Sequence, residues 1–484
     1  KNRPFKMDHH TVLDNERAKS DIDVEQITVC LHGGAAKLAV SRKFQEIVKN
    51  DPAFATDDEI FICRTERFQK GLMKAKRMEE IAEEMGLSSE EHAVLYEAIG
   101  ESSALLLHRL MFIPIVKALF TDEQREEWDS RMENLDILGC YAQTELGHGS
   151  NIRALETTAT FDPETDEFIL HSPTITARKW WPGGLGKVGT HAMVIARLVT
   201  GGKDYGIHNF IVPIRDPETH MPLPGVEVGD IGPKMGFLAV DNGYLALDKV
   251  RVPRRYMAMR YQTVDRNGRY QRRPSPHEKV SSIAMMQVRA SIVRTSGRDL
   301  AKGVTIATRY SAVRRQGYDE DAGPLGRGEE KAVLDHALQR HRLFPLLAAA
   351  YAHHFAGEDL WGQFEAVREM VARGDPAAGP AFAELHANSS GLKALCTEVT
   401  GHGIEECRKS CGGHGYLLAS GFPELWGTYM QTNTVEGDNH LLSQQVLKYL
   451  LKALRAARGG AGRAPAAPAG AAAYLGDAPA LLAA

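Results

Sequence analysis

Apolar residues recur every three or four positions through the first third of the chain, the spacing that places them on one face of a helix. The helical runs cover residues 25–30, 36–48, 93–110 and 112–120. Thr121-Asp122 interrupts the pattern, and a threonine at this point is expected to cap the helix that follows. Residues 1–140 are therefore predicted to form an N-terminal helical domain.

The pattern changes after Gly139. Residues 155–161 and 167–170 have the character of strands and flank a turn-rich spacer, which suits a hairpin. Further strand-like runs lie at residues 191–198, 208–212 and 243–247. Residues 141–265 are therefore predicted to form a middle antiparallel β domain.

Helical spacing then resumes. Its runs cover residues 283–310, 331–356, 360–372, 381–399 and 441–454, so residues 280–455 are predicted to form a C-terminal helical domain. Of the 26 residues from Gly459 onward, 20 are Ala, Gly or Pro. Such a composition buries too little apolar surface to offset the entropy of ordering, and residues 456–484 are expected to be a disordered tail.

Composition narrows the class of protein. A chain of 484 residues that is 43% hydrophobic and 25% charged is typical of a globular protein. No run of about 18 uncharged apolar residues occurs, so no membrane insertion is expected. A net charge of −4 argues against nucleic-acid binding, and six cysteines are too few for a disulfide framework.

One segment departs from this charge balance. Residues 249–273 hold nine Lys or Arg and a single acid, Asp265. The simpler interpretation is a solvated connector; the alternative is a contact with a polyphosphate or a neighbouring subunit.

Gly184-Leu185-Gly186-Lys187-Val188-Gly189 matches the G-x-G-x-x-G pattern of dinucleotide-binding loops. That fingerprint requires a helix after the glycines, so that the pyrophosphate meets a helix N-terminus. A strand-like run follows here instead, which argues against a Rossmann site.

Two other Gly-rich segments suit a flat ligand. Lys179-Trp180-Trp181-Pro182-Gly183-Gly184 sets two indoles beside backbone without side chains, and residues 140–151 form a polar loop between the predicted helical and β domains. Core tryptophans and a plain linker are the alternatives. Two adjacent tryptophans on a strand cannot both face one core.

The C-terminal region offers a carboxylate and a pair of arginines. Glu436 lies in a polar turn before the last helix, where Asn433 and Thr434 could cap that helix; an ordinary first-turn acid and a general base are equally compatible with this place. Arg314-Arg315 stands near a helix end, where guanidinium groups suit phosphate contacts or simply face solvent.

Metal binding is not expected. Cys407 and Cys411 stand four residues apart on a predicted helix with His402 and His414 nearby, but no second cysteine pair follows, as structural zinc sites usually require.

Five segments, taken in order, resemble the peroxisomal acyl-CoA oxidases, over about residues 15–455. They are Tyr141–Ser150, Lys179–Lys187, Arg309–Gln316, Cys411–Tyr416 and Val435–Asn439. The family is similar in fold to the acyl-CoA dehydrogenases, so the resemblance implies an α+β multidomain protein with an N-terminal helical domain, a middle antiparallel β domain and a C-terminal four-helix-bundle domain.

The resemblance also implies a cofactor and roles for single residues. FAD is expected, with Thr144 and Gly183 binding the flavin and with Ser150 and Trp181 as further contacts. Arg314 and Gln316 match an R-x-Q element that reaches the FAD of a partner subunit, so a homodimer is implied. Glu436 matches the family's proton acceptor.

The implied reaction converts a fatty acyl-CoA and O2 to trans-2-enoyl-CoA and H2O2, the first step of peroxisomal fatty acid β-oxidation. An acyl-CoA dehydrogenase that uses an electron-carrier protein is one alternative, and an inactive fragment that binds acyl-CoA or FAD is another. Such oxidases usually carry a further C-terminal helical domain, and many end in a Ser-Lys-Leu type signal. This chain ends in Leu-Leu-Ala-Ala, so a peroxisomal location is expected from the resemblance alone.

Overall fold

The computed structural model describes residues 9–273, 281–318, 330–458 and 470–477. The chain divides into two compact units, one of residues 1–38 and 285–484 and the other of residues 39–284. Helices come first along the chain, strands follow and helices return, so the predicted α+β order is confirmed.

A series of helices within residues 35–133 leads to the first strand. They are α3 (Ala35–Asn50), α4 (Arg64–Met85), α5 (Ser89–Ile99), a π-helical turn (His108–Phe112), α6 (Ile113–Leu119) and α7 (Asp122–Glu133). Thr121 caps α7 as predicted, because its Oγ1 accepts a hydrogen bond from Gln124 N at 3.3 Å. The run predicted over 93–110 is not one helix: Gly100 takes a left-handed conformation, with φ of 71°, and ends α5.

The described strands of residues 39–284 form three sheets. They are β1 (Gly139–Ala142), β2 (Thr158–Asp162), β3 (Glu167–His171), β4 (Lys179–Gly183), β5 (His191–Thr200), β6 (Lys203–Pro213), β7 (Val226–Asp230), β8 (Asn242–Leu247), β9 (Val250–Pro253), β10 (Gln262–Val264) and β11 (Tyr270–Arg272). The largest sheet has the order β1-β5-β2-β3-β9 with β6 also on β5; β4-β8-β7 and β10-β11 are separate. The β2–β3 hairpin is confirmed.

The largest sheet is mixed rather than wholly antiparallel. β5 pairs in parallel with β1 through Gly139–Ala142 and with β2 through Thr158–Thr160. The sequence pattern shows which residues are strands but not their direction, since that depends on connections across the whole sheet.

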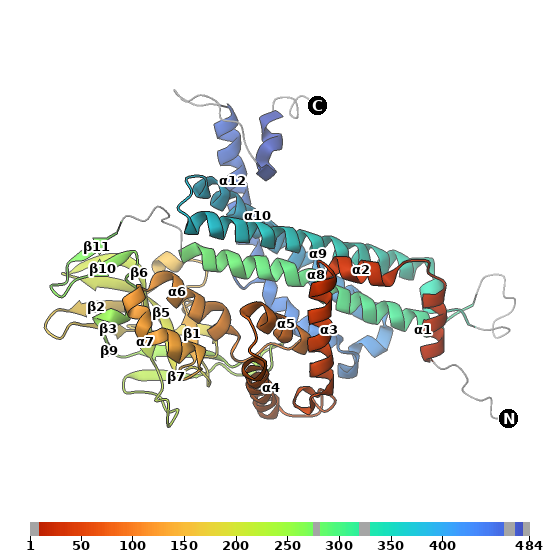
Figure 1. Cartoon of the computed structure of the whole chain (residues 1–484), viewed down its shortest axis with the longest axis horizontal. Helices are drawn as coiled ribbons and strands as arrows, with labels where there is room; N and C mark the ends of the chain where they lie inside the picture. Colours follow the sequence, from red (N-terminus) through yellow and green to blue (C-terminus); the bar gives the residue numbers. More distant parts are fainter. Residues whose placement is uncertain (1–8, 274–280, 319–329, 459–469, 478–484) are drawn as a thin grey trace. The chain divides into compact units, whose positions relative to one another are not determined.

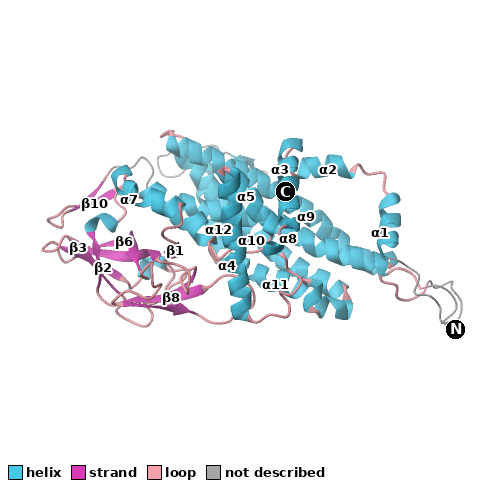
Figure 2. Cartoon of the chain, turned by 60° about the horizontal axis from the view of Figure 1, so that its bottom comes forward, coloured by secondary structure: helices cyan, strands magenta, loops and turns pink. Residues whose placement is uncertain are grey.

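Buried aromatic side chains fill the space within this sheet region. Phe168 lies 5.2 Å from Phe161 and 5.0 Å from Phe210 between ring centroids. Trp128 of α7 is buried against Tyr256 and His191, at 4.9 and 5.8 Å. Figure 2 shows the strands gathered in one region with α7 beside them. This packing fixes the end of β1, from which a predicted ligand loop starts.

Replacing Gly139 with alanine is expected to destabilise this region by about 3 kcal/mol, the upper end for overpacking. A Cβ atom on Gly139 would overlap the ring of Phe112, which is fully buried. The shift in the urea midpoint of unfolding measures the effect. Gly362→Ala is the control, because a Cβ there meets nothing within 4 Å on a helix, and a gain of about 0.5 kcal/mol is expected. Equal midpoints for the two variants would contradict the prediction.

The other unit is built mainly from three long helices. They are α8 (Ser281–Val313), α9 (Ala337–Ala372) and α10 (Ala378–Ser410), joined by α1 (His9–Ala18), α2 (Val24–Leu31), α11 (Phe422–Tyr429) and α12 (Asn439–Arg458). Figure 1 shows α8, α9 and α10 running side by side. Glycines allow the close approach: a Cβ on Gly297 of α8 would meet His354 N of α9 at 2.6 Å.

The C-terminal segment differs in part from the predicted disordered tail. Residues 456–458 end α12, and Gly470–Asp477 forms a 3₁₀-helix that contacts α10 and α12. Ala472 is buried, and Ala471 N donates to Glu384 Oε1 at 2.6 Å. Small side chains allow this close packing. Residues 459–469 and 478–484 lie outside the described residues.

Candidate active site

The two Gly-rich segments of the β region lie side by side. Trp180 N donates to Thr144 O at 2.9 Å, and Leu146 N donates to Arg178 O at 2.8 Å. Glu145 and Lys179 form the bridge between these contacts. The loop after β1 therefore pairs with β4, so one place holds residues that the sequence predicts separately.

The two tryptophans of β4 face different ways, as expected from strand geometry. Trp180 is partly buried and stacks on Tyr244, with ring centroids 5.7 Å apart. Trp181 is 56% exposed and its backbone takes φ of 88°, an uncommon conformation for a bulky residue. The interpretation as core residues does not hold for Trp181, whose indole presents a free aromatic face.

Thr144 offers a polar group on the loop that pairs with β4. Its side chain is partly buried, and no described residue hydrogen-bonds to its hydroxyl, whereas its carbonyl is held by Trp180 N. Ser150, farther along the same loop, is exposed. An exposed indole and a hydroxyl without a described partner, carried on two paired segments, suit the face and the edge of a flat heteroaromatic ring.

Gly183 is required by packing. A Cβ atom there would lie 3.0 Å from Val240 Cγ1 and 3.3 Å from Leu107 Cδ1. The following turn leads into strand β5 and not into a helix, so the argument against a Rossmann site is confirmed for Gly184–Gly189.

In the helical unit, Glu436 lies in a turn between α11 and α12. Its backbone takes φ of 55°, a strained conformation for a residue with a side chain, and Gly437 follows with φ of 106°. A Cβ on Gly437 would lie 2.8 Å from Leu442 Cδ2, so only glycine fits. No described residue accepts a hydrogen bond from Glu436 N–H, which leaves this donor available to a ligand.

Two buried cations hold this turn from different helices. Arg289 of α8 donates from Nε to Glu436 O at 2.8 Å. Lys393 of α10 donates from Nζ to Gly437 O at 2.8 Å and to Asn439 Oδ1 at 2.9 Å. Arg289 is 8% exposed and Lys393 is 0% exposed. We refer to Arg289 and Lys393 as the cation clamp.

The electrostatics of Glu436 balance two opposing effects. Burial raises the pKa of the carboxyl, while Arg289 and Lys393 act to lower that pKa. Burial and the charge of Arg289 in turn lower the pKa of Lys393 to about 8. A carboxylate with a raised pKa is a stronger base, as a general base requires.

The predicted capping of α12 is wrong in detail. Asp438 Oδ1 accepts from His440 N at 2.9 Å, whereas Thr434 Oγ1 donates to Gln431 O and Asn433 Nδ2 donates to Glu398 Oε2. Glu436 precedes the helix at positive φ, so it is not the first-turn acid that the sequence allows. Its conformation and contacts favour a role in binding or chemistry.

Arg314 and Gln316 follow the end of α8, as predicted. Both side chains are exposed, and Arg314 Nη2 donates to Gln316 Oε1 at 3.3 Å. The backbone between them is fixed, because Val333 N donates to Arg314 O and Gln316 N donates to Lys331 O. These residues and Glu436 belong to the helical unit, whereas Thr144, Ser150, Trp181 and Gly183 belong to residues 39–284.

The cation clamp is not apparent from the motifs of the sequence. Lys393 lies on the inward face of α10, in line with polar residues that are also fully buried: Ser389, Ser390, Thr397 and Thr400. A charged residue on the buried face of a helix was the available signal, since lysine is almost never buried without partners. Those partners stand far along the chain, which hides them from local patterns.

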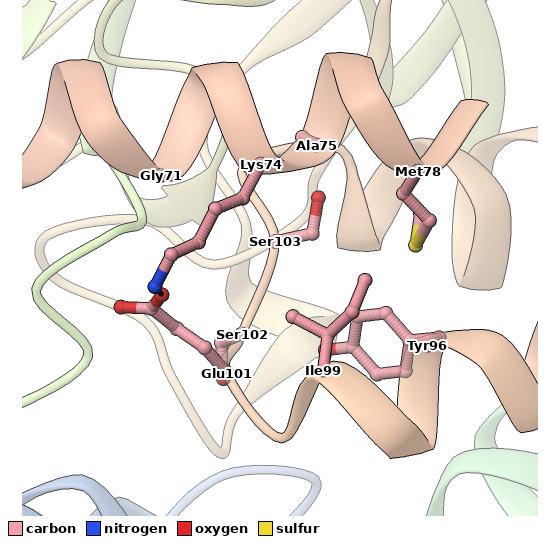
Figure 3. Close-up of a pocket in the computed structure, with 9 residues that line it drawn as sticks. All are labelled: Gly71, Lys74, Ala75, Met78, Tyr96, Ile99, Glu101, Ser102 and Ser103. Carbon is pink, nitrogen blue, oxygen red and sulfur yellow. Dashed lines mark hydrogen bonds and ion pairs between the residues drawn. The ribbon is translucent and has the colours of Figure 1, made fainter. Parts of the chain in front are cut away.

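A small pocket lies elsewhere, among α4, α5 and the segment after α5 (Figure 3). Its empty volume is about 230 Å³, and it is lined by Gly71, Lys74, Ala75, Met78, Tyr96, Ile99, Glu101, Ser102 and Ser103. Lys74 donates to Glu101 Oε2 at 2.6 Å and also pairs with Glu59. Its charged groups are paired with one another, and none of its lining residues is a predicted site residue.

The basic segment of residues 249–273 is largely occupied by ion pairs. Arg254 pairs with Asp166 at 2.6 Å, Arg260 with Asp122 at 2.8 Å and Arg251 with Asp162 at 3.0 Å. These contacts favour the interpretation as a connector over a polyphosphate site.

Neither a metal site nor a membrane-spanning helix is found in the part of the chain that the structure describes. No group of three or more His, Cys, Asp or Glu side chains there is arranged to hold a metal ion. Nor is any helix in those residues both long and apolar enough to cross a membrane.

Comparison with family models accounts for most of the chain. Residues 23–138 match the acyl-coenzyme A oxidase N-terminal model, residues 140–250 the acyl-CoA dehydrogenase middle domain and residues 283–451 the acyl-CoA oxidase C-alpha1 domain. The solved structure of Arabidopsis thaliana acyl-CoA oxidase 1 is 46% identical and superposes with a TM-score of 0.91, over 97% of this chain and 70% of that one. The chain belongs to the acyl-CoA oxidase family.

Other members of the acyl-CoA oxidase family agree with this assignment. Peroxisomal acyl-coenzyme A oxidase 1 of Arabidopsis thaliana is 47% identical over 445 residues, which are 91% of this chain and 66% of the relative. Acyl-CoA oxidase-2 of Caenorhabditis elegans, solved with FAD, ascaroside-CoA and ATP, is 39% identical, with a TM-score of 0.87 over 95% of this chain and 68% of that one. This chain thus spans about two thirds of the length of its curated relatives.

Proposed function

We propose that this chain is an FAD-dependent acyl-CoA oxidase that converts a fatty acyl-CoA and O2 to trans-2-enoyl-CoA and H2O2. The observation that carries the proposal is the Glu436 turn, in a chain of the acyl-CoA oxidase family. Its carboxyl has a raised pKa, and buried cations from two helices fix its backbone. This arrangement suits a base that must act at one position on a substrate.

Glu436 takes the proton from the Cα atom of the acyl thioester. A Cα–H is a far weaker acid than a carboxylic acid, so the negative charge that develops on the thioester oxygen must be stabilised by placed donors. The free N–H of Glu436 is such a donor. The strained backbone at Glu436 and Gly437 holds carboxylate and N–H in a fixed relation, which the cation clamp maintains.

Thr144, Trp181, Gly183 and Ser150 are proposed to hold FAD. The free hydroxyl of Thr144 and the exposed indole of Trp181 fit this group, while Gly183 keeps the strand packed behind them. FAD, when bound, supplies the acceptor for the hydride that leaves Cβ. C. elegans acyl-CoA oxidase-2, solved with FAD, supports this choice of cofactor.

A homodimer and a peroxisomal location are part of the proposal. Arg314 and Gln316 are exposed and face the same side of a fixed backbone, so they can reach a flavin held by a second copy. The peroxisomal location rests on relatives such as the Arabidopsis enzyme.

The test is an assay of the purified chain with palmitoyl-CoA in air. We expect a yellow protein with bound FAD and one H2O2 per enoyl-CoA formed. A different result would be that the substrate bleaches the flavin without forming peroxide and that an artificial electron acceptor restores turnover. That result would identify an acyl-CoA dehydrogenase. A protein that binds FAD or acyl-CoA without turnover would identify an inactive binding fragment.

A further inference from the structure

A lysine is buried completely beside the proposed flavin contacts. Lys179 of β4 is 0% exposed, and its ammonium donates three hydrogen bonds. The acceptors are Ile195 O at 2.7 Å, Glu145 Oε1 at 3.1 Å and Gln143 O at 3.2 Å. Two of these acceptors stand immediately before and after Thr144 along the chain.

The partner carboxylate is equally enclosed. Glu145 is 2% exposed and accepts from Glu156 N at 2.8 Å, from Thr157 N at 2.9 Å and from Thr157 Oγ1 at 2.6 Å, besides Lys179. The pair thus joins the loop after β1, the two residues just before β2, strand β4 and strand β5. Its polar groups are satisfied from several directions, as a buried ion pair requires.

Such a pair is a poor means of adding stability. Removing two charges from water offsets most of their mutual attraction, and well-packed apolar residues are often at least as stable. Burial lowers the pKa of Lys179 to about 8 despite the opposing effect of Glu145, which shows how strongly this site disfavours the charge. What the pair does supply is a fixed geometry for the backbone on both sides of Thr144.

We propose that Lys179 and Glu145 are positioning residues that hold the Thr144 hydroxyl in place for FAD, without themselves touching the cofactor. The inference rests on the proposed function, because it concerns the same flavin. Lys179 holds the residues on both sides of Thr144, through Gln143 O and the Glu145 carboxylate. Trp180 N in addition donates to the carbonyl oxygen of Thr144. The backbone that carries the Thr144 side chain is therefore held on both sides.

The experiment measures FAD binding in a double-mutant cycle. Lys179→Met, Thr144→Val and the double variant are purified without cofactor, and the dissociation constant for FAD is obtained by titration, together with the visible absorbance and circular dichroism of the bound flavin. Each single variant is expected to weaken binding about tenfold, the loss of about one hydrogen bond. The double variant is expected to bind as Thr144→Val does, because Lys179 acts through Thr144.

A second variant and a control keep the test decisive. Glu145→Gln preserves volume and removes the charge, so it replaces Lys179→Met in the cycle if that variant does not fold. Lys117→Met is the control, since Lys117 is an exposed lysine of α6 whose side chain pairs with Glu133 at the surface. This control is expected to bind FAD with the affinity of the wild-type protein.

The possible failures are distinguishable. Wild-type affinity in Lys179→Met and Glu145→Gln, or effects that add to Thr144→Val, would overturn the positioning role while leaving the proposed function intact. If the wild-type protein binds no FAD, the positioning role and the proposed function are both wrong. Lower unfolding temperatures with unaltered flavin affinity and spectrum would assign the pair to stability alone.

Discussion

Glu436→Gln is expected to reduce kcat by about 10⁴-fold, the upper range for loss of a general base. Glutamine keeps the shape of the side chain but cannot take the Cα proton. The backbone contacts from Arg289 and Lys393 reach carbonyl oxygens and not the carboxylate, so the turn is expected to keep its conformation. Steady-state peroxide formation measures kcat, and the visible absorbance of the flavin measures the bound cofactor.

The control for this variant is Glu365→Gln. Glu365 is a half-exposed acid whose contact with Arg368 is 3.8 Å long, and solvated pairs of this kind contribute little to stability. Both variants should remain yellow and equally stable. If Glu436→Gln turns over at close to the wild-type rate, another residue must be the general base.

Lys393→Met is expected to shift the acid limb of the kcat/KM profile to higher pH. The charges that face Glu436 are Arg289 from α8 and Lys393 from α10, and both lower its pKa. Removing one of them raises the pKa of Glu436, so a higher pH is needed before the carboxylate can act as a base. The profile from pH 5 to 9 provides the measurement.

The same variant is expected to lower kcat and stability. Gly437 O and Asn439 Oδ1 lose a charged donor, which costs about 3 kcal/mol for two such hydrogen bonds. A turn that shifts by about 1 Å can lose about 100-fold in rate. Lys409→Met, an exposed lysine on the same helix that pairs with Glu406, is the control. An unshifted acid limb in Lys393→Met would contradict the electrostatic role of the clamp.

Local patterns predicted the candidate site only in part. The segments around Thr144 and Trp181 are recognisable because glycines, hydroxyls and indoles cluster within a few residues, and Arg314, Gln316 and Glu436 stand in family-like motifs. The contacts that fix these residues are long-range. Arg289 lies 147 residues from Glu436, and Lys179 lies 34 residues from Glu145. No sequence spacing indicates that either pair is formed.

The sequence by itself determined the order of helices and strands, the alternation of Trp180 and Trp181 and the absence of a helix after Gly189. Each depends on neighbours within a few positions, where periodicity and turn residues act directly. The glycine stop at Gly100 is equally local, because its N–H caps Tyr96 O. Tertiary structure alone decided the parallel pairing of β5, the buried lysines and the backbone strain at Glu436. These depend on groups distant in sequence, whose burial and charge exist only once the chain has folded.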